Sequence, residues 1–334
     1  MSTPPRCRGV SLRNYRLINE RVTRRAVTAV KDLPTELRTY YYPVASAVSY
    51  NTAFDAGTAF ARAGLRRLSM GFGAFMADDN YNDHLYIGRR RIDMPANVPN
   101  RYIRTVAVAR GLWDGYRHET GGSPEAFHFL GMAAPIMIPL VALCAWGTPE
   151  LTFDATSPIQ DAVQGFFYLS SPAYLKVRAR RLGFRLAATE GRTWRCPCAF
   201  CEEFVSNHPF LYEVGRAWFL SASPSSVTAV DLRPGGALYQ AYPLLSEPEG
   251  GALRKEVTFA RIGHNHWVLD RIFSAVSRNS VDVDRLRGHA ASVVERYSGS
   301  TSSERFATAI RFGYGLAANA PEELPEDPMG VPGG

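Results

Sequence analysis

Cysteine is scarce in this chain, which has five cysteines among 334 residues. An odd number cannot pair completely, and three of the five stand too close together in the sequence to form comfortable disulfides with one another. This argues against a disulfide-stapled secreted protein and predicts a reducing, cytoplasmic (intracellular) location. The first residues, MSTPPRCRGVSLRNYR, also lack the apolar segment that follows the basic residues of a secretory signal.

Long hydrophobic runs are also nearly lacking. The stretch FLGMAAPIMIPLVALCAW at 129–146 has 18 residues without a charge, which is the lower limit for a membrane span. It contains Pro135 and Pro139, which interrupt a helix. We therefore predict a buried strand followed by a core helix here, and no membrane partner.

Charge of both signs is present, with a basic excess. The composition is 46% hydrophobic and 21% charged, which excludes a mostly disordered chain. There are 38 Lys+Arg against 31 Asp+Glu, a net charge of +7, and this favours a polyanionic partner. The arginine-rich stretch 1–40 is either a solvated helix face or a basic arm that contacts phosphates.

Strand and helix patterns alternate through the first half of the chain. Strands are predicted at 43–50, 65–75, 126–132 and 151–156, and helices at 52–63 and 100–118, the second of them amphipathic. This alternation is typical of parallel βαβ units, hence of a doubly wound sheet or a (β/α) barrel.

The pattern changes after about residue 172, which indicates a second subdomain. A basic segment, three clustered cysteines and a Pro/Gly/Ser-rich stretch lead to helical runs at 266–278 and 281–297. We predict four regions: a basic N-terminal arm at 1–40, an α/β portion at 41–170, a metal-binding subdomain with C-terminal helices at 171–300, and a disordered acidic tail at 318–334.

The three clustered cysteines are Cys196, Cys198 and Cys201, in the sequence RCPCAFCEE. Thiolates are soft ligands for Zn²⁺, and a structural zinc site takes four ligands, so one more is needed. His208 lies a few residues downstream, and His264 stands where a loop is expected to lead into a helix. The alternative is a group of reduced, buried cysteines without a metal.

Several blocks of the sequence together resemble the tRNA-guanine transglycosylases. The family carries C-x-C-x-x-C and a later His-Asn pair, as in CPCAFC at 196–201 and His264-Asn265. HFLGMAAP at 128–135 is similar to its strand with a glycine-proline turn, and LTFDATSP at 151–158 to its strand with a nucleophilic aspartate. LRRLSMGFGAF at 65–75 resembles its glycine-rich strand end, and the resemblance covers about 43–300.

The resemblance implies a fold, an activity and site residues. The fold would be a TIM-type (β/α) barrel with a zinc-binding subdomain, and the activity an exchange of guanine for a 7-deazaguanine base in tRNA or DNA. Asp154 would be the nucleophile. The base pocket would contain Gly71, Phe72, Gly73, Gly131 and Met132. Structural Zn²⁺ would be held by Cys196, Cys198, Cys201 and His264.

Three departures from the family pattern shape the prediction. Asp154 comes earlier than the family's nucleophile, so we expect a barrel that lacks some N-terminal strands and, with them, the family's second catalytic aspartate. The gap between Cys201 and His264 is long, which implies an insertion. SPIQDAVQG, after Asp154, lacks the arginine of the tRNA enzymes, which favours the branch that modifies DNA.

Two other functions stay open at this stage. The chain is alternatively a noncatalytic, zinc-containing subunit that binds nucleic acid while a partner subunit, or a second copy in a homo-oligomer, completes the site. The third option is a zinc-stapled α/β protein with a small-molecule role.

Overall fold

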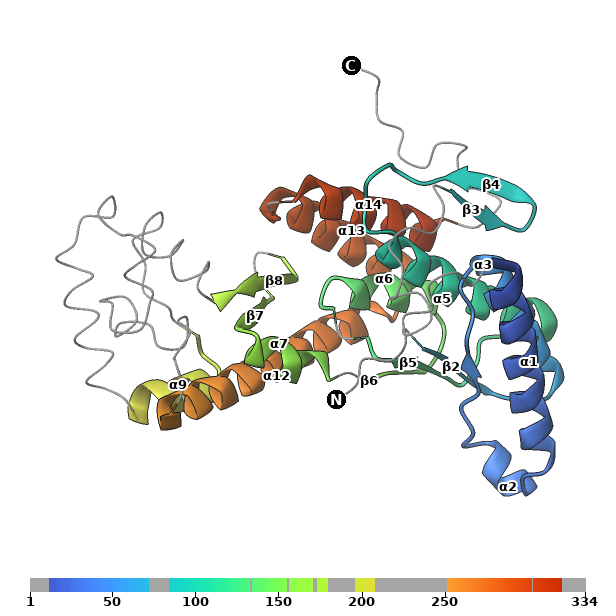
Figure 1. Cartoon of the computed structure of the whole chain (residues 1–334), viewed down its shortest axis with the longest axis horizontal. Coiled ribbons are helices and arrows are strands. Elements are labelled where there is room, and N and C mark those ends of the chain that lie inside the picture. Colours follow the sequence, from blue (N-terminus) through green and yellow to red (C-terminus); the bar gives the residue numbers. More distant parts are fainter. Residues whose placement is uncertain are drawn as a thin grey trace, which may run out of the picture. The chain divides into compact units, whose positions relative to one another are not determined.

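The computed structural model describes residues 12–71, 84–132, 134–154, 156–170, 173–179, 196–207, 251–301 and 303–319. The chain divides into two compact units (Figure 1). Unit 1 comprises Met1–Ala155 and Ala275–Gly334, and unit 2 comprises Thr156–Ser274. The tail expected to be disordered lies outside the described residues from position 320 onward.

Unit 1 contains a parallel sheet of four strands. They are β1 (Val44–Ala45), β2 (Arg67–Gly71), β5 (Ala126–Leu130) and β6 (Glu150–Asp154), in the order β1-β2-β5-β6. Each neighbouring pair is parallel, so the predicted βαβ units and the mixed α/β class are confirmed. The first strand is shorter than expected, since the helix after it already begins at Tyr50.

The two faces of this sheet differ in chemistry because side chains alternate along each strand. One face is apolar, where Phe127, Phe129 and Phe153 stack in sequence, with ring centroids 4.4 and 4.9 Å apart. The opposite face carries a row in which Ser69 pairs with His128, and His128 with Thr152. The sheet therefore buries one side and presents polar groups on the other.

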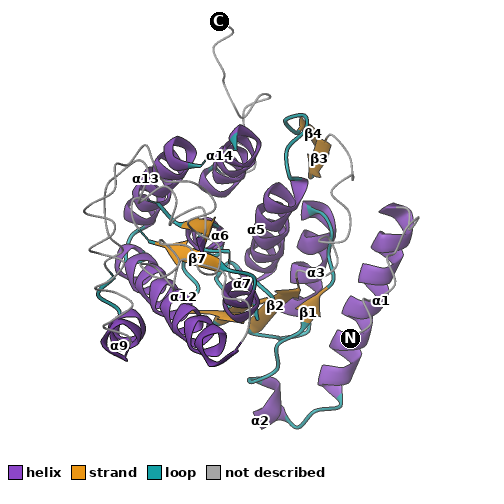
Figure 2. Cartoon of the chain, turned by 60° about the vertical axis from the view of Figure 1, so that its left-hand side comes forward, coloured by secondary structure: helices purple, strands orange, loops and turns teal. Residues whose placement is uncertain are grey.

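Three helices connect the parallel strands: α3 (Tyr50–Arg62), α5 (Asn100–Thr120) and α6 (Met137–Cys144). Figures 1 and 2 both show them on one side of the sheet, as right-handed crossovers between consecutive strands require. Helix α6 is buried over its whole length, which confirms the predicted strand and core helix in the charge-free stretch. Among the helices that the structure describes, none is both long and apolar enough to cross a membrane.

Helix α5 is central to unit 1. It contacts α3, α6 and the C-terminal helix α14 (Glu304–Ala318), which packs beside α13 (Val283–Ser300). Residues on all sides of α5 are buried, so the expected amphipathic pattern was wrong. The pattern was misread because residues such as Arg104 and Thr105 are polar but buried.

The contact between α3 and α5 depends on glycine. A Cβ atom at Gly111 would lie 2.4 Å from the carbonyl oxygen of Tyr50, and one at Gly115 would lie 2.1 Å from that of Phe54. Real Cβ atoms do not approach backbone oxygens so closely. Only glycine at these positions lets the two helix backbones meet.

The remaining elements of unit 1 lie outside this layer. Helices α1 (Leu12–Lys31) and α2 (Thr35–Arg38) form the arginine-rich N-terminal region, and α1 packs on α3 and β1. Strands β3 (His84–Ile87) and β4 (Arg90–Asp93) form an antiparallel pair that the sequence did not reveal.

Unit 2 is built around a long helix, α12 (Gly251–Asn279), whose residues up to Ser274 belong to this unit. It also contains α7 (Ser157–Val163), the antiparallel pair β7 (Phe166–Leu169) and β8 (Leu175–Arg178), and α9 (Ala199–Asn207). The helical run predicted at 266–278 is confirmed as part of α12, which starts earlier than expected.

The glycine contact predicts opposite effects for two glycine-to-alanine changes in helices. Gly115→Ala forces α3 and α5 apart and should lower the free energy of unfolding by about 1–3 kcal/mol. Gly288 in α13 has no atom near its Cβ position, so Gly288→Ala should stabilise the protein by about 0.5–1 kcal/mol. Urea unfolding followed by circular dichroism measures both. Equal effects of the two changes would contradict the close contact.

Candidate metal centre and the carboxylate at the sheet edge

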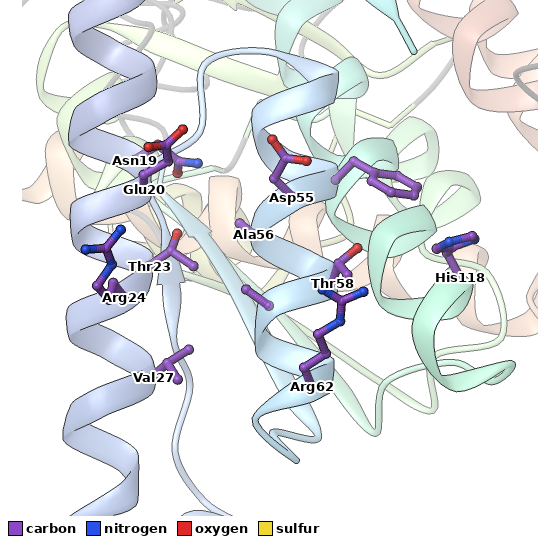
Figure 3. A pocket seen from close by; sticks show the side chains of 12 residues that line it. Asn19, Glu20, Thr23, Arg24, Val27, Asp55, Ala56, Thr58, Arg62 and His118 are labelled. Atoms are coloured by element: carbon purple, nitrogen blue, oxygen red, sulfur yellow. The ribbon is translucent and has the colours of Figure 1, made fainter.

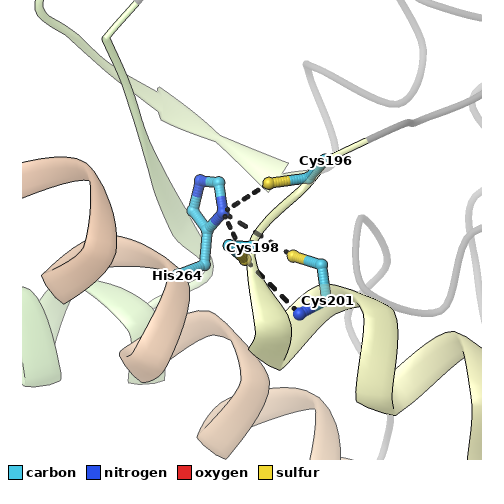
Figure 4. A group of neighbouring side chains, drawn as sticks. All are labelled: Cys196, Cys198, Cys201 and His264. Carbon is cyan, nitrogen blue, oxygen red and sulfur yellow. Dashed lines mark hydrogen bonds between the residues drawn. The ribbon is translucent and has the colours of Figure 1, made fainter. Parts of the chain in front are cut away.

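Four side chains in unit 2 meet in a cluster that could hold a metal ion (Figure 4). Cys196 and Cys198 precede α9, Cys201 lies in its first turn, and His264 comes from α12. Nδ1 of His264 lies 3.3 Å from Sγ of Cys196 and 3.6 Å from Sγ of both other cysteines. All four ligand atoms lie within 4.8 Å of one another.

These distances fit a tetrahedral zinc site. An ion about 2.3 Å from sulfur and about 2.05 Å from nitrogen separates the two atoms by about 3.6 Å in tetrahedral geometry. Cys198, Cys201 and His264 are at most 2% exposed, and four protein ligands leave no open position. The cluster is therefore compatible with a closed, structural metal site. His208, the other histidine considered from the sequence, lies outside the described residues.

His264 is oriented for metal binding by its second ring nitrogen. Nε2 lies 3.0 Å from the carbonyl oxygen of Tyr168, a pure acceptor, so Nε2 carries the proton. In the neutral ring Nδ1 then keeps its lone pair, which faces the three sulfur atoms and can bind a metal ion. Such an outer hydrogen bond fixes the tautomer of a ligand histidine.

The start of α9 positions two of the cysteines. The carbonyl of Cys198 accepts hydrogen bonds from the amides of Cys201 and Glu202, at 3.1 and 3.0 Å. The amide of Cys201 also donates to Sγ of Cys198, at 3.4 Å. The amide groups at a helix N-terminus favour negative charge, so this turn suits thiolates.

Hydrogen bonds within the cluster shift the pKa values of three of its members. Hydrogen bonds from Cys196 and Cys201 lower the pKa of Cys198, whereas the hydrogen bonds with Cys196 and Cys198 raise the pKa of Cys201. Burial lowers the pKa of His264, but hydrogen bonds to Cys196 and Cys198 outweigh it and raise the value to about 9. A thiolate is therefore favoured at Cys198 and disfavoured at Cys201.

Asn265, next to the ligand His264, connects α12 to the strand pair. Its side chain is fully buried, and its Oδ1 accepts from the amide of Tyr168 at 2.9 Å. Its Nδ2 donates to the carbonyls of Pro158 and Phe166, both at 3.2 Å. The His-Asn pair thus holds β7 and the start of α7 against the helix that carries the ligand.

Asp154 is the last residue of β6, at the carboxyl end of the parallel sheet in unit 1. Its side chain is 56% exposed, and its Oδ1 accepts a 2.6 Å hydrogen bond from the amide of Gly131. Its Oδ2 lies 3.6 Å from Nε2 of His128. Asp154 is therefore an accessible carboxylate with a defined orientation. The sequence did not single out His128, although its alternate position in AFHFL and the parallel register place it beside Asp154.

The predicted base-pocket residues are only partly described. Gly131 adopts a φ of +77° after β5, a conformation that favours glycine, and it contacts Asp154 through its amide. A Cβ at Gly71, at the end of β2, would make only an ordinary contact with Val44. Met132 is buried. Phe72 and Gly73 lie outside the described residues.

A pocket of about 680 Å³ lies elsewhere in unit 1, along the groove between α1 and α3 (Figure 3). Two of its buried polar atoms, Asn19 Oδ1 and Thr23 Oγ1, have no hydrogen-bond partner in the described part of the chain. Asp154 does not line it, and neither does any predicted base-pocket residue.

Compared with known proteins, the chain matches no family model and no curated sequence. The resemblance to the transglycosylases thus depends on the quoted motifs alone.

The ligand geometry predicts one zinc ion per chain. Cys201→Ser should lower the zinc content well below one, because a hydroxyl is a poor ligand for zinc. Cys144→Ser is the matched control, since Cys144 is a buried cysteine in α6, outside the cluster. Elemental mass spectrometry of the purified variants measures the content, and full zinc in the Cys201 variant would refute this ligand assignment.

The contacts of Asn265 predict that Asn265→Asp weakens the metal site. The change replaces two buried donors by an acceptor that faces two carbonyls, so we expect unit 2 to lose about 2–4 kcal/mol of stability. Zinc affinity should fall about 10- to 100-fold, because Asn265 holds Tyr168, whose carbonyl accepts from the ligand His264. Asn279→Asp is the control for affinity, since Asn279 lies in unit 1 and donates to the carbonyl of Ala275 in its own helix, so zinc affinity should stay unchanged. Competition with a chromophoric chelator measures affinity, and equal affinity in both variants would contradict this role.

Proposed function

We propose that this chain is a base-exchange transglycosylase that replaces guanine with a 7-deazaguanine derivative in nucleic acid. The observation that carries the proposal is the accessible, oriented carboxylate of Asp154 at the carboxyl end of a parallel strand. Active sites of (β/α) folds are built at this end of the sheet. The resemblance gives this same residue the role of nucleophile.

The strand order supports a barrel-type fold for unit 1. Sequential parallel strands stand side by side as β1-β2-β5-β6, without the reversal that marks a doubly wound sheet. This order, with all connecting helices on one side, is that of consecutive units of a TIM-type barrel. We propose that unit 1 is part of such a barrel.

The proposed reaction is a double displacement at the anomeric carbon of the target nucleotide. Asp154 attacks C1′, the bond from C1′ to guanine N9 breaks, and guanine leaves with the electron pair and takes up one proton. The incoming deazaguanine then attacks C1′ through its N9 and loses one proton. The bond between C1′ and the carboxylate breaks, and its electron pair returns to Asp154. The protons balance, and neither ATP nor a redox cofactor is consumed.

The polyanionic substrate agrees with the charge of the chain. The net charge is +7, and exposed arginines such as Arg21 and Arg25 lie on α1. Such side chains suit contacts with phosphates. DNA is favoured over tRNA because the segment after Asp154 lacks the arginine of the tRNA enzymes. Zinc, held by the Cys196, Cys198, Cys201 and His264 side chains, would brace unit 2 and supply no chemistry to the exchange.

Removing the nucleophile tests this function. Asp154→Asn should lower incorporation of labelled guanine or 7-deazaguanine into DNA or tRNA at least about 10³-fold, because an amide cannot form the glycosyl ester. Asp93→Asn is the control: it alters an exposed carboxylate in β4 and should leave incorporation unchanged. Zinc content should stay at one in both variants.

The same assay separates the proposed function from its alternative. DNA and tRNA are offered in parallel, and nucleoside mass spectrometry identifies the inserted base. Unchanged exchange by an Asp154→Asn complex with a partner subunit would overturn the assignment and point to a noncatalytic nucleic-acid-binding subunit.

A further inference from the structure

The polar face of the sheet brings a histidine next to the proposed nucleophile. In the register of β5 and β6, His128 pairs with Thr152 and Leu130 pairs with Asp154. All four positions are on the same face, because they alternate along their strands with the stacked Phe127, Phe129 and Phe153. Of these side chains, only His128 and Thr152 offer polar groups toward Asp154.

The contacts form a chain from Thr152 to Asp154. Nδ1 of His128 lies 2.6 Å from Oγ1 of Thr152, and Nε2 lies 3.6 Å from Oδ2 of Asp154. The other carboxylate oxygen, Oδ1, accepts from the amide of Gly131 at 2.6 Å. The distance to Nε2 is longer than a hydrogen bond, but such contacts often shorten when the substrate binds.

The carboxylate decides which nitrogen of His128 carries the proton. If Nδ1–H donated to Thr152, the lone pair of Nε2 would face the negative Oδ2, which is repulsive. With the proton on Nε2, the hydroxyl of Thr152 donates to Nδ1 and Nε2–H points at the carboxylate, so both contacts are attractive. Asp154 thus selects the tautomer with the proton on Nε2, and the hydroxyl of Thr152 can donate to Nδ1 in that tautomer.

We propose that His128, held by Thr152, is a positioning residue for Asp154. It directs Nε2–H at Oδ2 while Gly131 holds Oδ1, and together these fix the plane of the carboxylate toward the sugar. The inference rests on the proposed function and adds two residues to its site. The hydrogen bond strengthens when the negative charge returns to Asp154 as the glycosyl ester breaks, so it assists the second displacement.

Among the described residues, the aromatic neighbour of His128 is Tyr42, which belongs to a separate polar network. The ring of Tyr42 lies edge-on to the imidazole, with centroids 5.8 Å apart. The hydroxyl of Tyr42 accepts from Arg67 at 2.7 Å and donates to Glu150 at 3.1 Å, near the opposite end of the strands. This network packs against the ring and leaves its two nitrogens to Thr152 and Asp154.

Two isosteric changes of His128 separate its two contacts. The amide nitrogen of glutamine takes the place of Nε2, and that of asparagine takes the place of Nδ1. We expect His128→Asn to lower kcat for base exchange about 10- to 100-fold with KM unchanged, because displacing a nucleophile by about 1 Å lowers the rate by about this factor. His128→Gln should keep most of the activity. His118→Asn, an exposed histidine change in α5, is the control.

Changes at Thr152 test the other end of the chain of contacts. Thr152→Val keeps the shape and removes the hydroxyl, so it should lower kcat toward the His128→Asn value. Thr152→Ser keeps the hydroxyl, so its kcat should stay close to the wild-type value. Wild-type kcat in both His128→Asn and Thr152→Val would overturn the proposal, and so would equal losses in the Asn and Gln variants of His128.

A direct measurement does not depend on turnover. Nitrogen-15 NMR of labelled protein should show the Nε2–H tautomer of His128, and the Nε2 resonance should shift in Asp154→Asn. The Nδ1–H tautomer, or no shift in that variant, would overturn the pairing. If wild-type protein exchanges no base, the proposed function fails, while the NMR result still decides whether His128 is paired with Asp154.

Discussion

The parallel pairing of β5 with β6 in one register is the constraint on which the candidate active site depends. It places Leu130 opposite Asp154 and His128 opposite Thr152, on the face away from the stacked phenylalanines. A shift of one residue would turn Asp154 into the apolar side and bring Phe153 to the polar side. The hydrophobic stack therefore holds the carboxylate in place, because stacking of three aromatic rings on one face, two of them fully buried, specifies the register.

That sheet needs a rigid layer of helices above it. The glycines at 111 and 115 let α5 approach α3 until the backbones touch, and α6 and α14 pack against α5 as well. A site at strand ends is more precise when the elements that carry it cannot shift. The C-terminal helices complete this layer from a distant part of the sequence.

In unit 2, two neighbouring residues of helix α12 connect the cysteine cluster to the strand pair β7–β8. His264 presents Nδ1 to three thiols, and Asn265 ties the same turn of α12 to the backbone of β7. Tyr168 connects the two, since its carbonyl accepts from His264 and its amide donates to Asn265. Its hydroxyl donates to Asp161, which also pairs with Lys176, so α7, β7 and β8 are joined. A metal ion bound by the three thiols and His264 would join α9 to α12.

The sequence by itself determined the local features of this protein. Alternation of apolar residues located the parallel strands, and the charge-free stretch at 129–146 was correctly placed in the core. The spacing of Cys196, Cys198 and Cys201 indicated a metal site, because thiols separated by one and two residues can face one point. These features depend on residues close in sequence, where spacing fixes direction.

Only the tertiary structure decided which distant residues meet. It brought His264, the fourth ligand that the resemblance implied, to the three cysteines, and it placed His128 and Thr152 beside Asp154. It also showed α5 to be buried on all sides and revealed the antiparallel pairs β3–β4 and β7–β8. Strand register and helix contacts arise from packing between segments far apart in the chain, and no local pattern encodes them.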